Sequence, residues 1–379
     1  MNTAKRLDHI EEYYFSRKLK EVRYLISQEK PIINLGIGSP DLTPPKSTVN
    51  NLIEALKYPT AHKYQSYNGI DSLRRAIKSF YFNNYNVDLN HEHEILPLIG
   101  SKEGIMHISL AFLDEADEVL IPNPGYPTYS SVTKIVGAKP IFYDLKESNS
   151  WLPNIKDLEK MNLSKVKIMW VNYPNMPTGS NCSLSFFNDL ISFCEERNIL
   201  LINDNPYSFI LNDNPISLLM ARKSKNCLEL NSLSKSHNMA GWRLGMVVGS
   251  KENISNILKI KSNMDSGMFL PIQVGAIDAL NQSNNWYTDL NKIYLKRKKV
   301  VVKICEKLNL NFNKNGSGLF LWGKIPSNFK KSEDFIDELL YDKNIFITPG
   351  SIFGSNGEGY VRISLCCDEK KLKEALNRL

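Results

Sequence analysis

The chain contains the stretch Asn231-Ser232-Leu233-Ser234-Lys235-Ser236-His237-Asn238-Met239-Ala240-Gly241-Trp242-Arg243-Leu244-Gly245, which follows a run of strand-forming residues. Two serines, Ser232 and Ser234, closely precede Lys235, and Arg243 comes soon after it. A lysine amine can form a Schiff base with an aldehyde cofactor and can later act as a general base. Serine hydroxyls and a guanidinium can hold a phosphate, because the guanidinium supplies a fixed charge. For Lys235 taken alone, an exposed loop with no functional role is the simpler interpretation. Other motifs in the chain are needed to distinguish the two interpretations.

Short β-rich runs alternate with helical patterns around this stretch. The predicted strands are residues 95–99, 118–121, 140–143, 166–171, 199–203, 227–230 and 244–248. The predicted helices between them include residues 102–113, 128–136 and 185–197. Alternation of this kind indicates a mainly parallel sheet, and the apolar run Ile168-Met169-Trp170-Val171 is typical of a strand buried on both faces. We therefore predict an α/β fold whose large domain has a mainly parallel, seven-stranded sheet flanked by helices.

The pattern changes at the polar residues 281–285. The sequence then predicts a long helix over 286–308, a glycine-rich strand region over 316–322, a helix over 332–340, a strand over 360–364 and a final helix over 369–379. We interpret this part as a smaller α+β domain. The predicted organisation is an N-terminal segment, residues 1–45, a large domain, residues 46–282, and a small domain, residues 283–379. The first segment could pack with either domain, and we assign it to the small one.

Composition limits the class of protein and its surroundings. The 379 residues are 42% hydrophobic and 23% charged, which is typical of a globular chain and not of a coiled coil or a disordered one. The net charge of +7 is small and spread along the chain, so we expect no nucleic-acid partner. Six cysteines without a C-x-x-C pair favour a reduced, cytoplasmic setting. Residues 1–22 lack the apolar core of a signal peptide and no apolar run reaches the roughly 18 residues of a membrane helix, so we expect no membrane partner.

Four other sequence patterns give no support to a further functional site. No G-x-x-x-x-G-K-[ST] loop is present, and Gly36-Ile37-Gly38 is too short for a dinucleotide fingerprint. We interpret His91-Glu92-His93-Glu94 as a solvated turn, since adjacent side chains there point apart, and we expect no metal. The basic run Lys296-Arg297-Lys298-Lys299 is predicted to be a solvated helix face.

The form S-x-S-K-x-x-x-x-x-G-W-R-x-G, which residues 232–245 follow, resembles the lysine motif of the aspartate aminotransferase superfamily. These are class I and II enzymes of fold type I that use pyridoxal 5′-phosphate (PLP). Further family motifs follow in the expected order, so the resemblance spans residues 32–365. It implies that Lys235 binds PLP and is the catalytic residue. It also implies that Ser232, Ser234 and Arg243 hold the PLP phosphate.

Three residues match the family's contacts to the PLP ring. Asp204, at the end of the predicted strand 199–203, resembles the aspartate that pairs with the pyridine nitrogen. A carboxylate there keeps the nitrogen protonated, so the ring withdraws electrons more strongly. Tyr207 resembles the tyrosine that hydrogen-bonds the phenolic oxygen, and Tyr126 matches the aromatic residue that stacks on the ring.

A second phosphate contact is implied by Gly100-Ser101-Lys102-Glu103-Gly104, which follows a predicted strand and opens a helix. Backbone N–H groups at the start of a helix form an anion site. The segment is similar to the family's phosphate cradle, which implies that Ser101 and Lys102 contact the PLP phosphate. A plain helix N-cap would give the same short pattern.

The segment Tyr64-Gln65-Ser66-Tyr67-Asn68-Gly69, followed by Leu73-Arg74, resembles the family pattern Y-x-x-x-x-G-x-x-x-L-R. In the family the tyrosine reaches the phosphate of the cofactor in the neighbouring subunit. The resemblance therefore implies that Tyr64 acts across an interface and that the protein is a homodimer.

Two residues match family positions that contact the α-carboxylate of the substrate. They are Gly38, within residues 34–41, and Arg362, within residues 360–364. An arginine can grip a carboxylate with two parallel hydrogen bonds, which fixes the direction of the Cα–H bond.

One position departs from the family pattern. The family places an asparagine that binds the phenolic oxygen of PLP directly before Pro-Thr-Gly, but this chain has Met176 there. A thioether cannot donate a hydrogen bond. Asn175 lies one residue earlier, and the sequence leaves open whether it compensates.

The motifs together imply a PLP-dependent aminotransferase that moves an amino group between an amino acid and a 2-oxo acid. Two alternatives share the same parts: a PLP-dependent carbon–sulfur β-lyase and a catalytically silent PLP-binding protein. The motif set, including residues 263–267, is more similar to alanine and LL-diaminopimelate aminotransferases than to aspartate aminotransferase. The amino donor and the acceptor stay open, because substrate pockets are built from scattered side chains.

Overall fold

A seven-stranded sheet forms the centre of the computed structural model, which describes residues 3–9 and 14–379. The strand order is β2-β8-β7-β6-β5-β3-β4, and all neighbours run parallel except β8, which is antiparallel to β2 and β7. The strands are β2 (Ile95–Leu98), β3 (Glu118–Asn123), β4 (Lys139–Asp144), β5 (Val166–Val171), β6 (Leu200–Asp204), β7 (Cys227–Ser232) and β8 (Gly245–Gly249). Each predicted strand of the large domain is one of these seven, so the predicted α/β sheet is confirmed.

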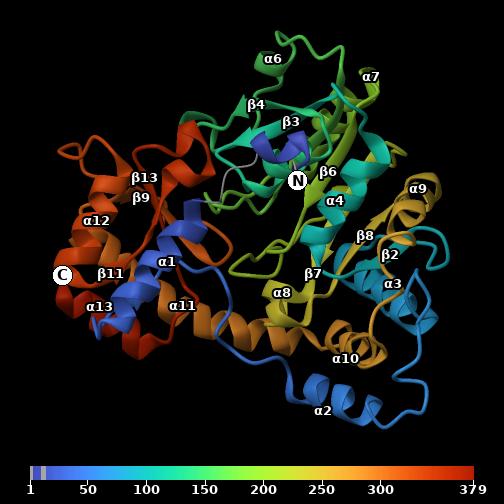
Figure 1. The fold of residues 1–379 in the computed structure, drawn as a ribbon, viewed down its shortest axis with the longest axis horizontal. Coiled ribbons are helices and arrows are strands. Elements are labelled where there is room, and N and C mark those ends of the chain that lie inside the picture. Colours follow the sequence, from blue (N-terminus) through green and yellow to red (C-terminus); the bar gives the residue numbers. More distant parts are fainter. Residues whose placement is uncertain (1–2, 10–13) are drawn as a thin grey trace.

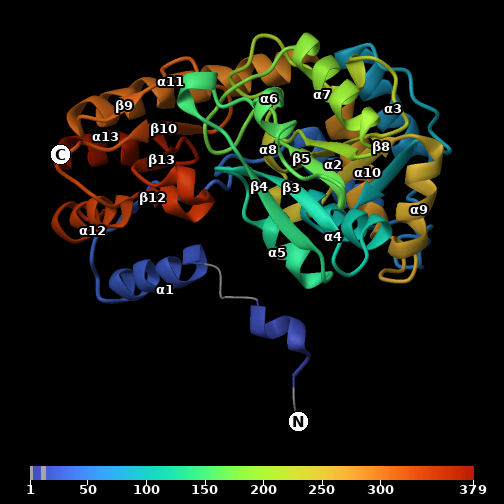
Figure 2. The ribbon, with the colours of Figure 1, turned by 90° about the horizontal axis from the view of Figure 1, so that it is seen from above.

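Helices cover both faces of this sheet (Figures 1 and 2). Successive side chains of a strand point to opposite faces. Val247 accordingly packs in one core cluster, which includes residues of α4 and α9, whereas Val248 packs in another with residues of α3 and α10. The helices of this part are α2 (Lys46–Ala55), α3 (Asp71–Tyr85), α4 (Ser101–Phe112), α5 (Thr128–Ile135), α6 (Ile155–Leu158), α7 (Leu184–Glu196), α8 (Leu233–Ser236), α9 (Lys251–Lys261) and α10 (Leu270–Leu280).

A smaller antiparallel sheet with the order β12-β13-β10-β9 lies beside the large one. Its strands are β9 (Asn311–Phe312), β10 (Phe320–Lys324), β12 (Thr348–Pro349) and β13 (Tyr360–Ser364). Its helices are α11 (Asn284–Lys307), α12 (Ser332–Lys343) and α13 (Glu369–Arg378). The long helix α11 begins beside α10 and runs into this smaller part (Figure 1).

The N-terminal segment packs against this smaller part. Strand β1 (Ile33–Asn34) pairs in parallel with β11 (Ile345–Phe346). Helix α1 (Tyr14–Ser27) lies beside α12 (Figures 1 and 2), and the Nζ atom of Lys18 is 2.6 Å from a carboxylate oxygen of Asp337. Because Lys18 is buried, this ion pair fixes the helix more firmly than an exposed pair would.

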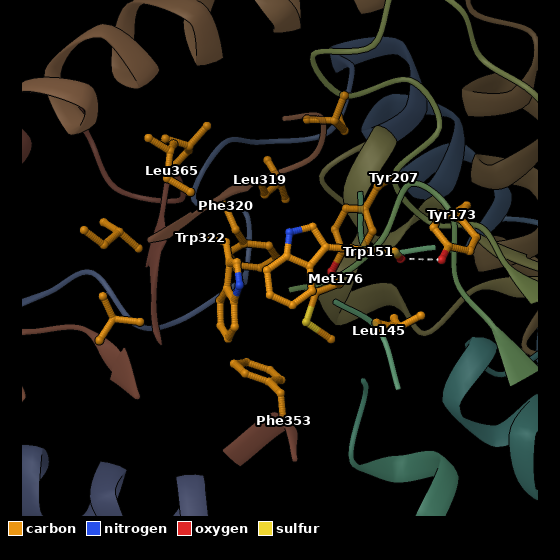
Figure 3. Packing of buried hydrophobic residues seen from close by; sticks show 14 of the residues in the cluster. Leu145, Trp151, Tyr173, Met176, Tyr207, Leu319, Phe320, Trp322, Phe353 and Leu365 are labelled. Atoms are coloured by element: carbon orange, nitrogen blue, oxygen red, sulfur yellow. Dashed lines mark hydrogen bonds between the residues drawn. The ribbon is translucent and has the colours of Figure 1, made fainter. Parts of the chain in front are cut away.

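Aromatic side chains fill the junction between the two sheets (Figure 3). The ring of Trp322 stacks on Tyr360 at 5.2 Å and meets Trp151 edge-on at 6.2 Å. One continuous core cluster contains buried residues of both parts, among them Met176 and Phe353. The edge of the large sheet is therefore held against the smaller sheet.

Two sequence predictions can be compared with these details. His91–Glu94 forms a turn before β2, as predicted. The basic run 296–299 is not a wholly solvated face, because Arg297 is 4% exposed. Its Nη1 and Nη2 atoms donate to the two carboxylate oxygens of Asp41 at 2.6 and 2.8 Å, so a buried ion pair explains the arginine.

The remaining short elements are six 3-10 helices in the described residues: η1 (Lys5–His9), η2 (Glu147–Asn149), η3 (Leu218–Met220), η4 (Ala240–Trp242), η5 (Gly350–Phe353) and η6 (Ser355–Gly357). Within residues 3–9 and 14–379, no helix combines the length and the apolar character that crossing a membrane requires.

Candidate active site

A cavity of about 590 Å³ lies at the carboxyl ends of the central strands, where the smaller sheet faces them. Ligand sites of open α/β sheets form at this edge. All the predicted site residues except Tyr64 line the cavity: Gly38, Ser101, Lys102, Tyr126, Asp204, Tyr207, Ser232, Ser234, Lys235, Arg243 and Arg362. The fold therefore brings together residues that are far apart in the sequence.

Asp204 is the last residue of β6 and is buried. The hydroxyl of Tyr129 donates to its Oδ2 atom at 2.8 Å, while its Oδ1 atom has no hydrogen-bond partner among the described residues. Burial raises the pKa of Asp204 to about 6, although the Tyr129 hydrogen bond acts in the opposite direction. A buried carboxylate oxygen without a partner fits the protonated pyridine nitrogen of PLP.

Lys235 lies in the one-turn helix α8, directly behind β7. Its Nζ atom donates to the backbone oxygen of Gly38 at 2.6 Å. Burial lowers the pKa of Lys235, so a larger fraction of its amine is neutral near pH 7 than in an exposed lysine. Only the neutral amine is a nucleophile. The short helix turns the lysine back over the carboxyl edge of the sheet.

The N-terminus of α4 forms the predicted anion site. Gly100 caps this helix with a φ of 84°, and no side chain caps it. A Cβ atom at Gly100 would lie 2.1 Å from the Nη2 atom of Arg243, so only glycine admits the guanidinium there. The first backbone N–H groups of α4, with Ser101 and Lys102, therefore share one region with Arg243. Together these groups fit a phosphate.

Two tyrosines border the same space. Tyr126 is partly buried, and its ring meets that of Tyr129 edge-on at 5.5 Å. Tyr207 is 7% exposed, and its ring meets Phe320 of the smaller sheet edge-on at 6.0 Å. Burial raises the pKa of both phenols, which stay protonated at neutral pH and can donate hydrogen bonds.

Asn175 does not take the place of the missing asparagine at position 176. Its Oδ1 atom accepts from the Oγ1 of Thr178 at 2.7 Å, and its Nδ2 atom donates to the backbone oxygen of Asn172 at 3.2 Å. Asn175 therefore stabilises the turn, and it does not line the cavity. Met176 and Asn172 do line it, and the side chain of Asn172 bonds the backbone of Asp204 and of Met176.

Arg362 enters the cavity from β13 of the smaller sheet. Its guanidinium lies 3.9 Å from the ring centroid of Phe320 and 4.9 Å from that of Phe353. Its Nη2 atom donates to the backbone oxygen of Gly36 at 2.9 Å. A Cβ atom at Gly38 would lie 2.4 Å from Phe320, so the backbone there is pressed against the same ring. The charge is thus held in one position between two aromatic rings.

Tyr64 lies away from the cavity of its own chain and is 90% exposed. The segment that carries Tyr64 is nevertheless fixed by hydrogen bonds. The buried Nζ atom of Lys261 donates to the backbone oxygen of Tyr67 at 2.9 Å and to Oδ1 of Asp265 at 2.9 Å. The exposed tyrosine is therefore carried on an anchored segment.

Several cavity residues were missed by the sequence prediction. Tyr129 comes three residues after Tyr126 in the same segment, and Asn172 directly follows β5, so their positions could have indicated them. No sequence signal pointed to the apolar side chains contributed by distant elements: Phe15, Ile37, Phe320, Ile352 and Phe353.

A partly buried lysine, a buried carboxylate and an anion site at one edge of a mainly parallel sheet define a class, the PLP-dependent enzymes of fold type I. The family model for aminotransferase class I and II matches residues 30–379. An LL-diaminopimelate aminotransferase from Natranaerobius thermophilus is 38% identical over 382 residues, covering 100% of this chain and 99% of the relative.

Solved structures agree with this result. A structure of BacF from Bacillus subtilis with bound substrate has a TM-score of 0.95 and 34% identity, and the match covers 100% of this chain and 97% of that one. An aminotransferase from Staphylococcus aureus has a TM-score of 0.90 and 30% identity over 99% of this chain and 98% of that one. The chain belongs to the aminotransferase class I and II family. It is a PLP-dependent aminotransferase that acts on amino acids and 2-oxo acids.

Proposed function

We propose that Lys235 is the lysine that binds PLP and that it then carries the proton removed from the substrate Cα. When bound, PLP supplies an electron-withdrawing ring that stabilises negative charge at this carbon. Lys235 would receive the Cα proton on Nζ as a general base and would release it again from Nζ as a general acid. Its partly buried position in the cavity wall and its lowered pKa support this role.

Asp204, Tyr207 and Tyr126 are proposed to hold the PLP ring. Asp204 offers its unpartnered Oδ1 atom to the pyridine nitrogen, Tyr207 donates to the phenolic oxygen, and Tyr126 stacks on the ring. The phosphate is assigned to the α4 N-terminus and Arg243, with the nearby side chains of Ser101, Lys102, Ser232 and Ser234. The single observation that carries the proposal is the buried Oδ1 atom of Asp204, which is satisfied only by a donor inside the cavity.

The substrate α-carboxylate is assigned to Arg362 and to the backbone at Gly38. The fixed guanidinium can grip a carboxylate with two hydrogen bonds. Since every amino acid and every 2-oxo acid carries this carboxylate, one arginine can serve both halves of the reaction.

A homodimer is proposed because Tyr64 is exposed and lies away from the cavity of its own chain. Other exposed apolar side chains occur in the nearby segments: Ile53, Leu56, Tyr58, Tyr67, Met264 and Phe269. Exposed apolar groups of this kind are typical of an interface with another protein. In such a dimer Tyr64 would reach the phosphate site of the neighbouring subunit.

The domain boundaries at residues 45 and 282 and the cytoplasmic location are also proposals. Pairing of β1 with β11 supports the assignment of the N-terminal segment to the small domain. Side chains of α2 bond Asp278 of α10, which supports a start of the large domain near residue 46. Six free cysteines support a reducing compartment.

An amino-donor panel tests the proposed function. The holoenzyme should transfer nitrogen from an amino acid to 2-oxoglutarate or pyruvate. LL-diaminopimelate, after which relatives are named, and alanine are the first donors to assay. Release of pyruvate and ammonia from a sulfur amino acid without an acceptor would instead support the β-lyase. No turnover of any donor would support the silent protein.

A further inference from the structure

The part of the cavity wall that is not assigned to PLP is apolar. It consists mainly of hydrocarbon and aromatic side chains, namely Phe15, Ile37, Met176, Phe320, Ile352 and Phe353. Phe15 and Ile37 come from the N-terminal segment, and Met176 comes from the loop after β5. The other three come from the smaller part of the chain. The polar side chains of this part are Ser39, Tyr129, Asn172 and Arg362. Tyr129 and Asn172 are hydrogen-bonded within the protein, and Arg362 is assigned to the α-carboxylate. An amino acid held at Arg362 would therefore place its side chain among apolar groups.

The described residues of the same cavity offer no free carboxylate to a second ammonium group. Among the described residues, Asp204 is the only acidic side chain that lines it. One oxygen of Asp204 accepts from Tyr129, and the other is assigned to the PLP nitrogen. Asp41, which follows Gly38 closely in the chain, is held by both outer nitrogens of Arg297.

The segment that the proposed dimer would bring to the neighbouring cavity also lacks a carboxylate. It reads His62-Lys63-Tyr64-Gln65-Ser66-Tyr67-Asn68-Gly69. The surface hollow next to it is lined by Met268 and Phe269. Asp265, close by in the sequence, is paired with the buried ammonium of Lys261 at 2.8 Å. Among the described residues of this cavity and of the segment 62–69, none therefore offers a free carboxylate to the far end of a diamino acid.

We infer that this enzyme prefers amino donors with bulky apolar side chains over a diamino dicarboxylate such as LL-diaminopimelate, and that Phe15, Ile37 and Ile352 select them. This inference rests on the proposed function. A second ammonium and carboxylate would lose water in this cavity without gaining partners. An aromatic or branched aliphatic side chain would bury its surface there. The preference thus has two causes: apolar side chains gain contacts in the cavity, and the second charged end of a diamino dicarboxylate is disfavoured there.

The donor preference is measured with the holoenzyme and 2-oxoglutarate as acceptor. We expect kcat/KM for phenylalanine or leucine to exceed that for LL-diaminopimelate at least about tenfold, the gain typical of burying one large apolar side chain. Equal values, or a preference for LL-diaminopimelate, would overturn the inference while leaving the aminotransferase proposal intact. Absence of turnover with all three donors would count against both.

Two variants of the apolar cavity wall distinguish a role in substrate selection from a general effect on the structure. Phe15→Ala and Ile352→Ala should raise KM for phenylalanine about tenfold or more, while KM for alanine stays unchanged, since alanine does not reach the wall. The control is Tyr24→Ala on the same helix, where the side chain is 64% exposed and outside the cavity. A loss that is equal for phenylalanine and alanine would overturn the selective role.

Binding without reaction gives an independent readout. The probes are 3-phenylpropionate and pimelate, which are phenylalanine and diaminopimelate without their amino groups. Calorimetric titration of the holoenzyme should give a lower Kd for 3-phenylpropionate, and Phe15→Ala should reduce the difference. Tighter binding of pimelate to the unmodified enzyme would overturn the inference.

Discussion

The hydroxyl of Tyr129 donates a 2.8 Å hydrogen bond to Oδ2 of Asp204, while Oδ1, which is proposed to meet the PLP nitrogen, has no hydrogen-bond partner among the described residues. Tyr129 is itself fixed, because its ring stacks on Trp170 at 4.9 Å. The carboxylate is therefore oriented by a rigid neighbour before the cofactor binds. Hydrogen bonds to a charged group are worth about 1.5–3 kcal/mol, so this contact should be measurable.

Tyr129→Phe should weaken PLP binding roughly tenfold to a hundredfold, which corresponds to the loss of such a hydrogen bond. The measurement is the Kd of PLP for the apoprotein. A matched control is Tyr143→Phe, since that buried hydroxyl donates to the backbone oxygen of Trp170 at 2.7 Å and does not line the cavity. If both variants bind PLP as the unmodified protein does, Tyr129 does not orient Asp204.

Asp204→Asn should stabilise the apoprotein at high pH. Burial raises the pKa of this carboxyl from 3.8 to about 6, so the folded state binds the proton more tightly than the unfolded state. The stability that Asp204 contributes is therefore present below pH 3.8 and lost as the pH rises through 6. At 1.36 kcal/mol per pKa unit, the loss approaches about 3 kcal/mol at pH 8.

Urea unfolding of the two apoproteins at pH 4.5 and at pH 8 measures this difference. The advantage of Asp204→Asn should be large at pH 8 and should shrink at pH 4.5. The exposed Asp213→Asn serves as the control and should show no advantage at either pH. An equal advantage of Asp204→Asn at both pH values would mean that the carboxyl is not protonated preferentially in the folded apoprotein.

Arg362→Lys should reduce kcat/KM for every amino donor by a similar factor. Lysine keeps the charge but cannot form the two parallel hydrogen bonds. Disrupting a buried charged pair typically lowers the binding free energy by 2–5 kcal/mol, so the loss should be about thirtyfold or more. Steady-state kinetics with several donors check this, with the exposed Arg75→Lys as the control. A loss confined to one donor would make Arg362 a selector of side chains.

Tyr64 should act on the cofactor of the neighbouring subunit. Lys235→Ala subunits and Tyr64→Phe subunits should each show low activity alone. Hybrid dimers should regain activity, because one of their two sites combines an intact Lys235 with an intact Tyr64. Activity is measured after subunit exchange has been verified by mass spectrometry. Verified subunit exchange without any gain in activity would mean that Tyr64 acts on the cofactor of its own subunit.

The large sheet could be predicted well from the sequence, and the apolar half of the site could not. Strand β5 ends in the apolar run 168–171 and β6 begins with the apolar run 200–202, and polar residues follow each run, so both their existence and their functional edge are local properties. Lys235 and Asp204 each lie at or just beyond the end of a strand, but their predicted roles came from the resemblance to the family's motifs.

The residues that sequence reasoning missed depend on packing between distant elements. Phe15 reaches the cavity because β1 pairs with β11 and α1 is tied to α12, and no local pattern encodes either contact. Arg297 was predicted to be solvated because its neighbours are lysines, but its partner Asp41 is more than two hundred residues away. The sequence shows that Met176 departs from the family pattern. Only the structure shows that the side chain of Asn175 bonds Thr178 and does not replace the missing asparagine.

The identity of the lysine that binds PLP is the central claim, and reduction of the holoenzyme with borohydride followed by peptide mass spectrometry tests it most directly. Two of the described lysines line the cavity, Lys235 and Lys102, so the experiment can identify either of them as the lysine that binds PLP. We expect the phosphopyridoxyl group on Lys235 alone, and on no lysine of Lys235→Ala. A phosphopyridoxyl group on Lys102 or on another lysine of the unmodified enzyme would contradict it.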